Sequence, residues 1–259
     1  TSLFMGGFFP GLLIGIVLIA YCYFHCKRRG LKGTSDAFTW KRAGEAVWDA
    51  KWALINPIII LGGIYTGIFT PTEAAAVAAI YAFICGAFLH RELKLNTFLK
   101  AISTSCSTTA TTMVILGCAT AFSKVITIEQ IPAMVANALM TVSDSKIVIL
   151  LLINLLLLIV GCFMDTTPAI LILAPILMPV ASSIGVDPIH FGLIMVCNLA
   201  IGFITPPLGI NLFVASRIAD SKMEVILKGI LPFIGCMLAC LALITYIPNI
   251  VMFLPNLMK

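Results

Sequence analysis

Long apolar runs with very few charged residues restrict what this sequence can fold into. Residues 8–24, 97–122 and 229–247 are apolar over lengths that suit membrane helices. Hydrophobic residues make up 61% of the chain and charged residues 10%, whereas soluble domains are about half apolar and about a quarter charged. The excess apolar surface needs lipid as its solvent. The sequence therefore predicts an all-α integral membrane protein with several helical spans, and excludes a soluble globular domain.

Basic residues gather in three segments. Residues 25–52, 90–100 and 217–228 contain 13 of the 16 Lys and Arg residues. Cytoplasmic loops of membrane proteins carry such an excess, so we expect these segments on the cytoplasmic side and the C-terminus on the periplasmic side. This topology requires that residues 147–184 make no net crossing of the membrane.

The segment 147–184 consists of two apolar arms around a polar tip at residues 161–168. The first arm, residues 147–160, would form about 21 Å of helix, against a hydrocarbon core about 30 Å thick. These features predict a re-entrant hairpin that enters and leaves the bilayer on the same side. The alternative is two ordinary spans with Asp165 in an aqueous loop.

A second interruption lies within residues 189–217, which are otherwise apolar. Pro206 and Pro207 are adjacent, and two successive prolines remove two amide donors and cannot continue a regular helix. The pattern predicts a discontinuous transmembrane helix with its break at residues 202–209. A simple proline kink without a ligand role is the alternative.

Two further segments have structural interpretations. Residues 34–52 place Trp40, Val47 and Trp48 on one helical face, which predicts an amphipathic helix at the membrane interface; a connector packed on the protein is the alternative. Residues 57–89 predict a helical hairpin or two short spans, and Glu73 at the break between its arms is interpreted as a structural cap. Between residues 97 and 122 many Ser and Thr hydroxyls can bond back to the backbone or across to another helix.

The two breaks are the places where chemistry is expected. A carboxylate such as that of Asp165 is costly at membrane depth unless it is paired, hydrated or bound to an ion. Broken helices supply free carbonyls and helix ends, which suit Na⁺ and an anionic substrate. With the hydroxyls of Thr166, Thr167 and Thr205 they predict a Na⁺ site, because hard cations prefer oxygen ligands. Asp165 or Thr166 could instead cap the helix that follows.

Other classes of function find no support in the sequence. No nucleophile stands near a base partner, and no phosphate-binding loop or zinc-type Cys/His grouping is present. The nine cysteines are interpreted as small buried hydrophobes. We therefore expect neither an enzyme nor a nucleic-acid-binding protein.

Four motifs resemble the large membrane (M) subunit of tripartite ATP-independent periplasmic (TRAP) transporters. In chain order they are Gly67-Ile68-Phe69-Thr70-Pro71-Thr72-Glu73-Ala74-Ala75-Ala76, Asp165-Thr166-Thr167-Pro168, Asp187-Pro188-Ile189-His190-Phe191-Gly192 and Gly202-Phe203-Ile204-Thr205-Pro206-Pro207-Leu208-Gly209-Ile210-Asn211. The resemblance covers nearly the whole chain and corresponds to the C-terminal half of that subunit. It implies one half of an inverted-repeat, elevator-type ion-transporter fold, and it makes the N-terminal half of the same subunit an expected partner.

The resemblance also implies which residues bind. Gly161, Gly202, Thr205 and Leu208 would hold one Na⁺, partly through backbone carbonyls. With Asp165 and Thr166 added from the hairpin tip, the candidate Na⁺ ligands are Gly161, Asp165, Thr166, Gly202, Thr205 and Leu208. The candidate substrate-binding residues are Thr167, Pro168, Pro206, Gly209 and Asn211.

By this resemblance the function is Na⁺-coupled import of an organic acid, of the sialic acid or C4-dicarboxylate type, across the bacterial inner membrane. A periplasmic substrate-binding protein would deliver the acid, and a small four-helix membrane subunit would support the permease. Residues 1–130 would form scaffold-type spans with the arm helix at 34–52, residues 131–223 the transport-type region, and residues 224–259 a C-terminal span. The alternatives are a binding-protein-independent Na⁺/dicarboxylate symporter and a non-transporting membrane scaffold subunit.

Overall fold

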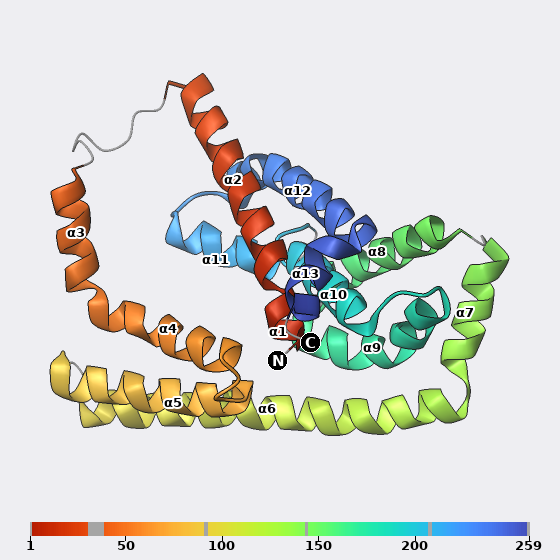
Figure 1. Ribbon diagram of the computed structural model, residues 1–259, viewed down its shortest axis with the longest axis horizontal. Coiled ribbons are helices and arrows are strands. Elements are labelled where there is room, and N and C mark those ends of the chain that lie inside the picture. The colour runs from red at the N-terminus through yellow and green to blue at the C-terminus, as the bar shows by residue number, and fades with distance from the viewer. Residues whose placement is uncertain (1, 31–38, 91–92, 143–144, 207–208, 258–259) are drawn as a thin grey trace. The chain divides into compact units, whose positions relative to one another are not determined.

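A computed structural model describes residues 2–30, 39–90, 93–142, 145–206 and 209–257. These residues form helices and no strand, and six candidate spans among them are long and apolar enough to cross a membrane. The prediction of an all-α, multi-span membrane protein is confirmed. The helices, shown in Figure 1, are α1 (Ser2–Gly6), α2 (Phe8–Arg28), α3 (Trp40–Asp49), α4 (Lys51–Tyr65), α5 (Pro71–Ile84), the π-helix η1 (Cys85–Leu89), α6 (Leu95–Ile128), α7 (Ile131–Val142), α8 (Lys146–Phe163), α9 (Thr166–Ser183), α10 (Pro188–Gly202), α11 (Ile210–Ile218), α12 (Met223–Tyr246) and α13 (Pro248–Leu257).

The chain divides into two compact units. One contains residues 26–112, and the other contains residues 2–25 and 113–259. This division reflects how densely residues contact one another within each unit. The functional division at residues 130 and 223 concerns which segments move, and it stays a prediction.

In the first unit α3 is shorter than the predicted amphipathic segment and meets α4 at a bend of 70°. Residues 34–38 lie outside the described residues, and Lys51 already belongs to α4. No residue of α3 is buried, and Trp40 and Trp48 are 83% and 68% exposed. The apolar face of α3 is therefore exposed and is not buried against the rest of this unit.

A capping box starts α5. The Thr70 N–H donates to Glu73 Oε2 at 2.8 Å, and the Glu73 N–H donates to Thr70 Oγ1 at 3.3 Å. Each side chain thus satisfies a backbone donor that the first helical turn leaves free. The interpretation of Glu73 as a structural cap is confirmed. Helices α4 and α5 pack as a hairpin, and Tyr81 Oη donates to the carbonyl of Trp52 across it at 2.9 Å.

Helix α6 is longer than the predicted span of 97–122. Several of its threonine hydroxyls donate to carbonyls four residues earlier, as Thr104 does to Lys100 and Thr108 does to Thr104, at 2.9 and 3.0 Å. Of the two roles considered for these hydroxyls, the bond back to the helix backbone is the one that is formed.

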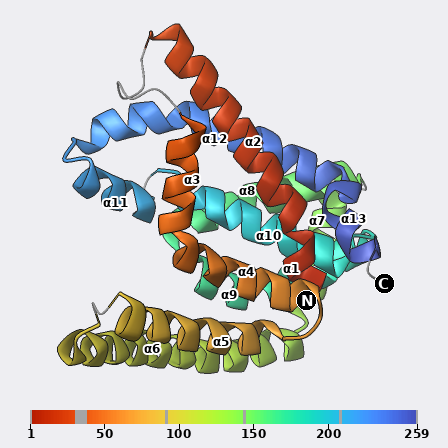
Figure 2. The ribbon, with the colours of Figure 1, turned by 60° about the vertical axis from the view of Figure 1, so that its left-hand side comes forward.

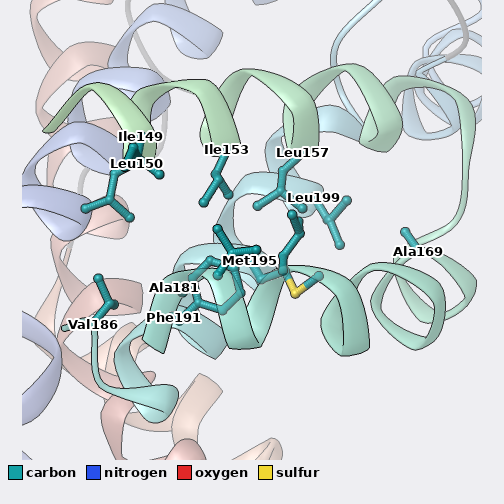
Figure 3. Close-up of a cluster of buried hydrophobic side chains, with 12 residues drawn as sticks. Ile149, Leu150, Ile153, Leu157, Ala169, Ala181, Val186, Phe191, Met195 and Leu199 are labelled. Atoms are coloured by element: carbon teal, nitrogen blue, oxygen red, sulfur yellow. The ribbon is translucent and has the colours of Figure 1, made fainter. Parts of the chain in front are cut away.

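The second unit is built on α8, α9 and α10, whose apolar side chains form one buried cluster. Ile153 and Leu157 point from α8 toward Phe191 and Met195 of α10 (Figure 3). The first arm of the predicted hairpin is longer than expected, because α8 continues through Phe163. The break between the arms is only Met164 and Asp165, so its predicted extent of 161–168 is wrong.

Each arm of this hairpin is an 18-residue helix, or about 27 Å at 1.5 Å per residue. That length is close to the thickness of the hydrocarbon core, so the argument that the first arm is too short to cross no longer applies. The re-entrant course now depends on the distribution of Lys and Arg alone, and it stays a prediction.

The broken helix is confirmed. Helix α10 ends at Gly202, and α11 begins at Ile210. The predicted last span, residues 229–247, corresponds to α12, which ends at Tyr246; the short helix α13 follows it within the segment 224–259. Helix α2 crosses α12 in the view of Figure 2, and the rings of Tyr21 and Phe233 meet edge to face at a centroid distance of 4.8 Å.

We expect α3 to lie in the membrane interface. If α4 tilts by about 20° from the membrane normal, as spanning helices do on average, a 70° bend turns α3 toward the membrane plane. The chain's three tryptophans, Trp40, Trp48 and Trp52, all belong to α3 or α4. In vesicles, lipids brominated near the headgroup should quench the chain's tryptophan fluorescence more strongly than lipids brominated deep in the acyl chains. Quenching by aqueous acrylamide without quenching by either lipid would show that α3 stands in water.

Candidate ion site at paired helix ends

Helices α8 and α10 pack along each other and run in the same direction. Asn154 of α8 is hydrogen-bonded to Asn198 of α10, and further along both helices Gly161 contacts Gly202. Residue numbers rise together along the shared seam, so the helices are parallel. Their C-terminal ends consequently lie at the same level, although they are about 40 residues apart in the chain.

The contact between Gly161 and Gly202 is made by backbone atoms. A Cβ on Gly202 would lie 2.5 Å from the carbonyl carbon of Gly161 and 2.6 Å from its Cα. A Cβ on Gly161 would lie 3.2 Å from the Cα of Gly202 and 3.2 Å from the carbonyl oxygen of Leu199. No side chain fits between the two backbones, so glycine is required at this junction for steric reasons rather than for conformational freedom.

Two converging helix C-termini create a negative local potential. The last four carbonyls of an α-helix have no partner within the helix, and each C-terminal end carries about half an elementary negative charge. Among the described residues no group of three or more His, Cys, Asp or Glu side chains could hold a metal. The oxygens at the junction are backbone carbonyls and, as described next, the Thr205 hydroxyl, and oxygen ligands suit a hard cation such as Na⁺.

The break after α10 folds back onto this junction. The Thr205 N–H donates to the Gly202 carbonyl at 2.9 Å, and the Thr205 hydroxyl donates to the Ile201 carbonyl at 2.7 Å. Because the hydroxyl uses its proton on the backbone, the lone pairs of Oγ1 remain available to a cation. Gly209 is buried with a φ of +45°, and a Cβ there would lie 3.3 Å from the Thr205 carbonyl oxygen.

The structure brings together most of the predicted residues of the broken helix. The Asn211 N–H donates to the Phe203 carbonyl at 3.3 Å, so the start of α11 lies beside the end of α10. Gly202, Thr205, Gly209 and the backbone of Asn211 thus share one region with Gly161, and Pro206 lies partly buried within the break. Leu208, a candidate Na⁺ ligand, lies outside the described residues, as does Pro207.

The hairpin tip contributes less than expected. Asp165 occupies the N-cap position of α9, yet its exposed carboxylate makes no capping hydrogen bond. Thr166 and Pro168 are half-buried, and Thr167 is exposed. Within the described part of the chain no hydrogen bond joins these four residues to the break after α10. The tip is near the junction because Asp165 follows Gly161 by one turn of chain, but its role as a ligand stays a prediction.

Sequence reasoning missed a part-buried polar network behind the junction. Asn198 Nδ2 donates to the backbone carbonyl of Asn154 at 3.0 Å and to Asn154 Oδ1 at 2.8 Å. Asn154 Nδ2 donates to Thr245 Oγ1 of α12 at 3.1 Å. The signal that could have found it is a single amide in the middle of each of two apolar runs, since an amide there needs a partner.

Comparison with known proteins identifies the family. The family model described as "Tripartite ATP-independent periplasmic transporter, DctM component" matches residues 1–250. The chain belongs to the DctM family of TRAP transporter permeases. The predicted family is thus confirmed.

Three relatives illustrate the family's range. The chain is 53% identical to an isethionate TRAP transporter permease protein, DctMQ, of Oleidesulfovibrio alaskensis, over 97% of this chain and 40% of that protein. It is 40% identical to the sialic acid TRAP transporter large permease protein SiaM of Vibrio cholerae, over 99% and 60% of the two chains. It is 41% identical to the C4-dicarboxylate TRAP transporter large permease protein DctM of Pseudomonas aeruginosa, over 98% and 60%. The chain therefore spans 40–60% of the length of these relatives.

Replacing Gly202 by alanine should destabilise the DctM-family chain, because the added methyl would overlap the Gly161 backbone. Overpacking of this kind costs about 1–3 kcal/mol. Gly235→Ala in α12 is a matched control, since nothing lies within 4 Å of its Cβ position and alanine is favoured over glycine within a helix by about 0.5–1 kcal/mol. Thermal unfolding in detergent should show a lower midpoint for Gly202→Ala and an unchanged or higher one for Gly235→Ala. Equal midpoints for the two variants would contradict the backbone contact.

Proposed function

We propose that this chain is part of the large permease subunit of a Na⁺-coupled secondary transporter that imports an organic acid. The observation that carries the proposal is the junction at which the C-terminal ends of α8 and α10 meet, with Gly161 against Gly202 and the Thr205 hydroxyl oxygen beside them. Like partial charges at two adjacent helix ends repel each other, and a bound cation removes that repulsion. The family supplies the transport context.

The proposed Na⁺ ligands are the carbonyls near Gly161 and Gly202, the Thr205 hydroxyl, and Asp165, Thr166 and Leu208. Ligands from the end of α8 and from the break after α10 would join the hairpin tip to the broken helix when Na⁺ is bound. Binding of the ion would in this way order the surface that the organic acid meets.

Four of the five proposed substrate contacts lie at or beside a helix start, and Pro206 lies in the break before α11. Helix α9 begins at Thr166 and α11 at Ile210, and the N-terminal end of a helix attracts a carboxylate through its positive partial charge. The contacts are Thr167, Pro168, Pro206, Gly209 and Asn211. Isethionate, sialic acid and C4-dicarboxylates, the acids in the relatives' names, are all small organic anions, and this supports an organic anion as the substrate class.

The remaining parts of the proposal concern assembly and movement. Residues 131–223 would move as the transport region against scaffold spans in residues 1–130, which include the arm helix α3. The chain would lie in the bacterial inner membrane with its C-terminus in the periplasm, in keeping with the distribution of Lys and Arg. A periplasmic binding protein would deliver the acid, and a small membrane subunit and the remainder of the large subunit would complete the permease.

Uptake by the assembled complex tests the proposal. Proteoliposomes with an inward Na⁺ gradient should accumulate labelled isethionate, sialic acid or succinate when the matching binding protein is present. Uptake should stop when K⁺ replaces Na⁺. Uptake without any binding protein would instead indicate an independent symporter, and no uptake of any organic acid would favour a scaffold subunit.

Thr205 provides the residue-level test. Thr205→Val should raise the Na⁺ concentration for half-maximal uptake about tenfold, the factor that about 1.4 kcal/mol of lost interaction produces. Thr205→Ser retains the hydroxyl and is the matched control, for which the Na⁺ dependence should stay close to that of the unmodified protein. An unchanged Na⁺ dependence in Thr205→Val would remove Thr205 from the ligand set.

A further inference from the structure

Part-buried hydrogen bonds join α8, α10 and α12 behind the junction. Asn198 is fully buried, with 0% of its surface exposed, and its Nδ2 donates to two oxygens of Asn154. Asn154 in turn donates to Thr245, which is 1% exposed. We refer to Asn154 and Asn198 as the asparagine pair. It is the polar part of a seam whose other side chains are aliphatic or aromatic.

The asparagine pair lies on the same seam as the glycine contact. Asn198 precedes Gly202 by four residues and Asn154 precedes Gly161 by seven, which are about one and two helical turns. Residues at these spacings share a helix face. The pair therefore sits directly behind the two helix ends, on the line along which α8 could slide or rotate against α10.

Apolar packing resists such sliding poorly. Contacts between aliphatic side chains are non-directional, and lipid offers the same apolar surroundings to a helix that has slipped. Hydrogen bonds are directional. One amide that donates to both the main-chain and the side-chain oxygen of a single residue fixes the height of α10 on α8 and its rotation about its own axis.

The asparagine pair is not the best solution for stability alone. Asn198 Oδ1 is buried and has no hydrogen-bond partner, and an unsatisfied buried acceptor costs free energy. Turning the amide over would not help, because Oδ1 would then face Asn154 O and Asn154 Oδ1, two acceptors. A leucine of similar size would fill the same space without this cost.

We infer that Asn154 and Asn198 are positioning residues for the ion site. They set the register of α8 on α10 at which the backbones of Gly161 and Gly202 touch, and so they set the affinity of the junction for Na⁺. Through the hydrogen bond that Asn154 donates to Thr245, α12 is held in the same register against α8. This inference rests on the proposed function, because it assigns the pair a role in the Na⁺ site described there.

A double substitution separates positioning from simple stabilisation. Asn198→Leu alone leaves Asn154 with unpaired polar atoms, so both thermal stability and Na⁺ affinity should fall. In Asn154→Leu/Asn198→Leu both amides are gone, and replacing both partners by apolar groups restores much of the stability. The double variant should nevertheless need about ten times more Na⁺ for half-maximal uptake than the unmodified complex, the factor that about 1.4 kcal/mol of lost binding produces. A double variant that regains both stability and normal Na⁺ dependence would overturn the inference.

Two controls complete the experiment. Asn249→Leu makes the same chemical change at an exposed amide of α13, and its Na⁺ dependence should be unchanged. Thr245→Val is nearly isosteric and replaces the leucine variants if these are not recovered folded. It should raise the half-maximal Na⁺ concentration about threefold. An unchanged half-maximal Na⁺ concentration would count against the network.

If the unmodified complex shows no Na⁺ dependence, the proposed function fails and this inference with it. If it shows Na⁺ dependence that the double variant shares, only the inference fails.

Discussion

The backbone contact between Gly161 and Gly202 is the constraint on which the rest of the candidate site depends. It places the C-terminal ends of two parallel helices side by side, where their partial negative charges repel each other. The buried cluster of α8, α9 and α10 and the hydrogen bonds of the asparagine pair oppose that repulsion. A bound cation, as proposed above, would relieve this repulsion.

The features that could be predicted from sequence are those with local physical causes. Apolar runs identify the membrane spans because lipid requires them, and Pro206 with Pro207 marks the break because neither has an N–H to continue a helix. The capping box of Thr70 and Glu73 follows from residue types three positions apart. Each of these signals lies within a few residues and needs no knowledge of what packs against it.

The features that were missed depend on contacts between distant parts of the chain. Considered alone, Gly161 favours an end to the helix. In the structure the backbones of Leu199 and Gly202 pack against it, and α8 continues through it to Phe163. Asn154 and Asn198 are 44 residues apart, and only the parallel packing of their helices makes them partners.

A site made from backbone oxygens separates the choice of ion from the choice of substrate. If backbone carbonyls of α8 and α10 supply much of the Na⁺ site, its affinity depends on where the helix ends lie, and few side chains beyond Thr205, Asp165 and Thr166 contribute to it directly. The side chains of the hairpin tip and of the break, such as Thr167 and Asn211, are then left to contact the organic acid. Exchanging a side chain that contacts the substrate leaves the register of α8 on α10 unchanged. With this arrangement, relatives named for isethionate, sialic acid and C4-dicarboxylates can differ in those side chains and still use one ion site.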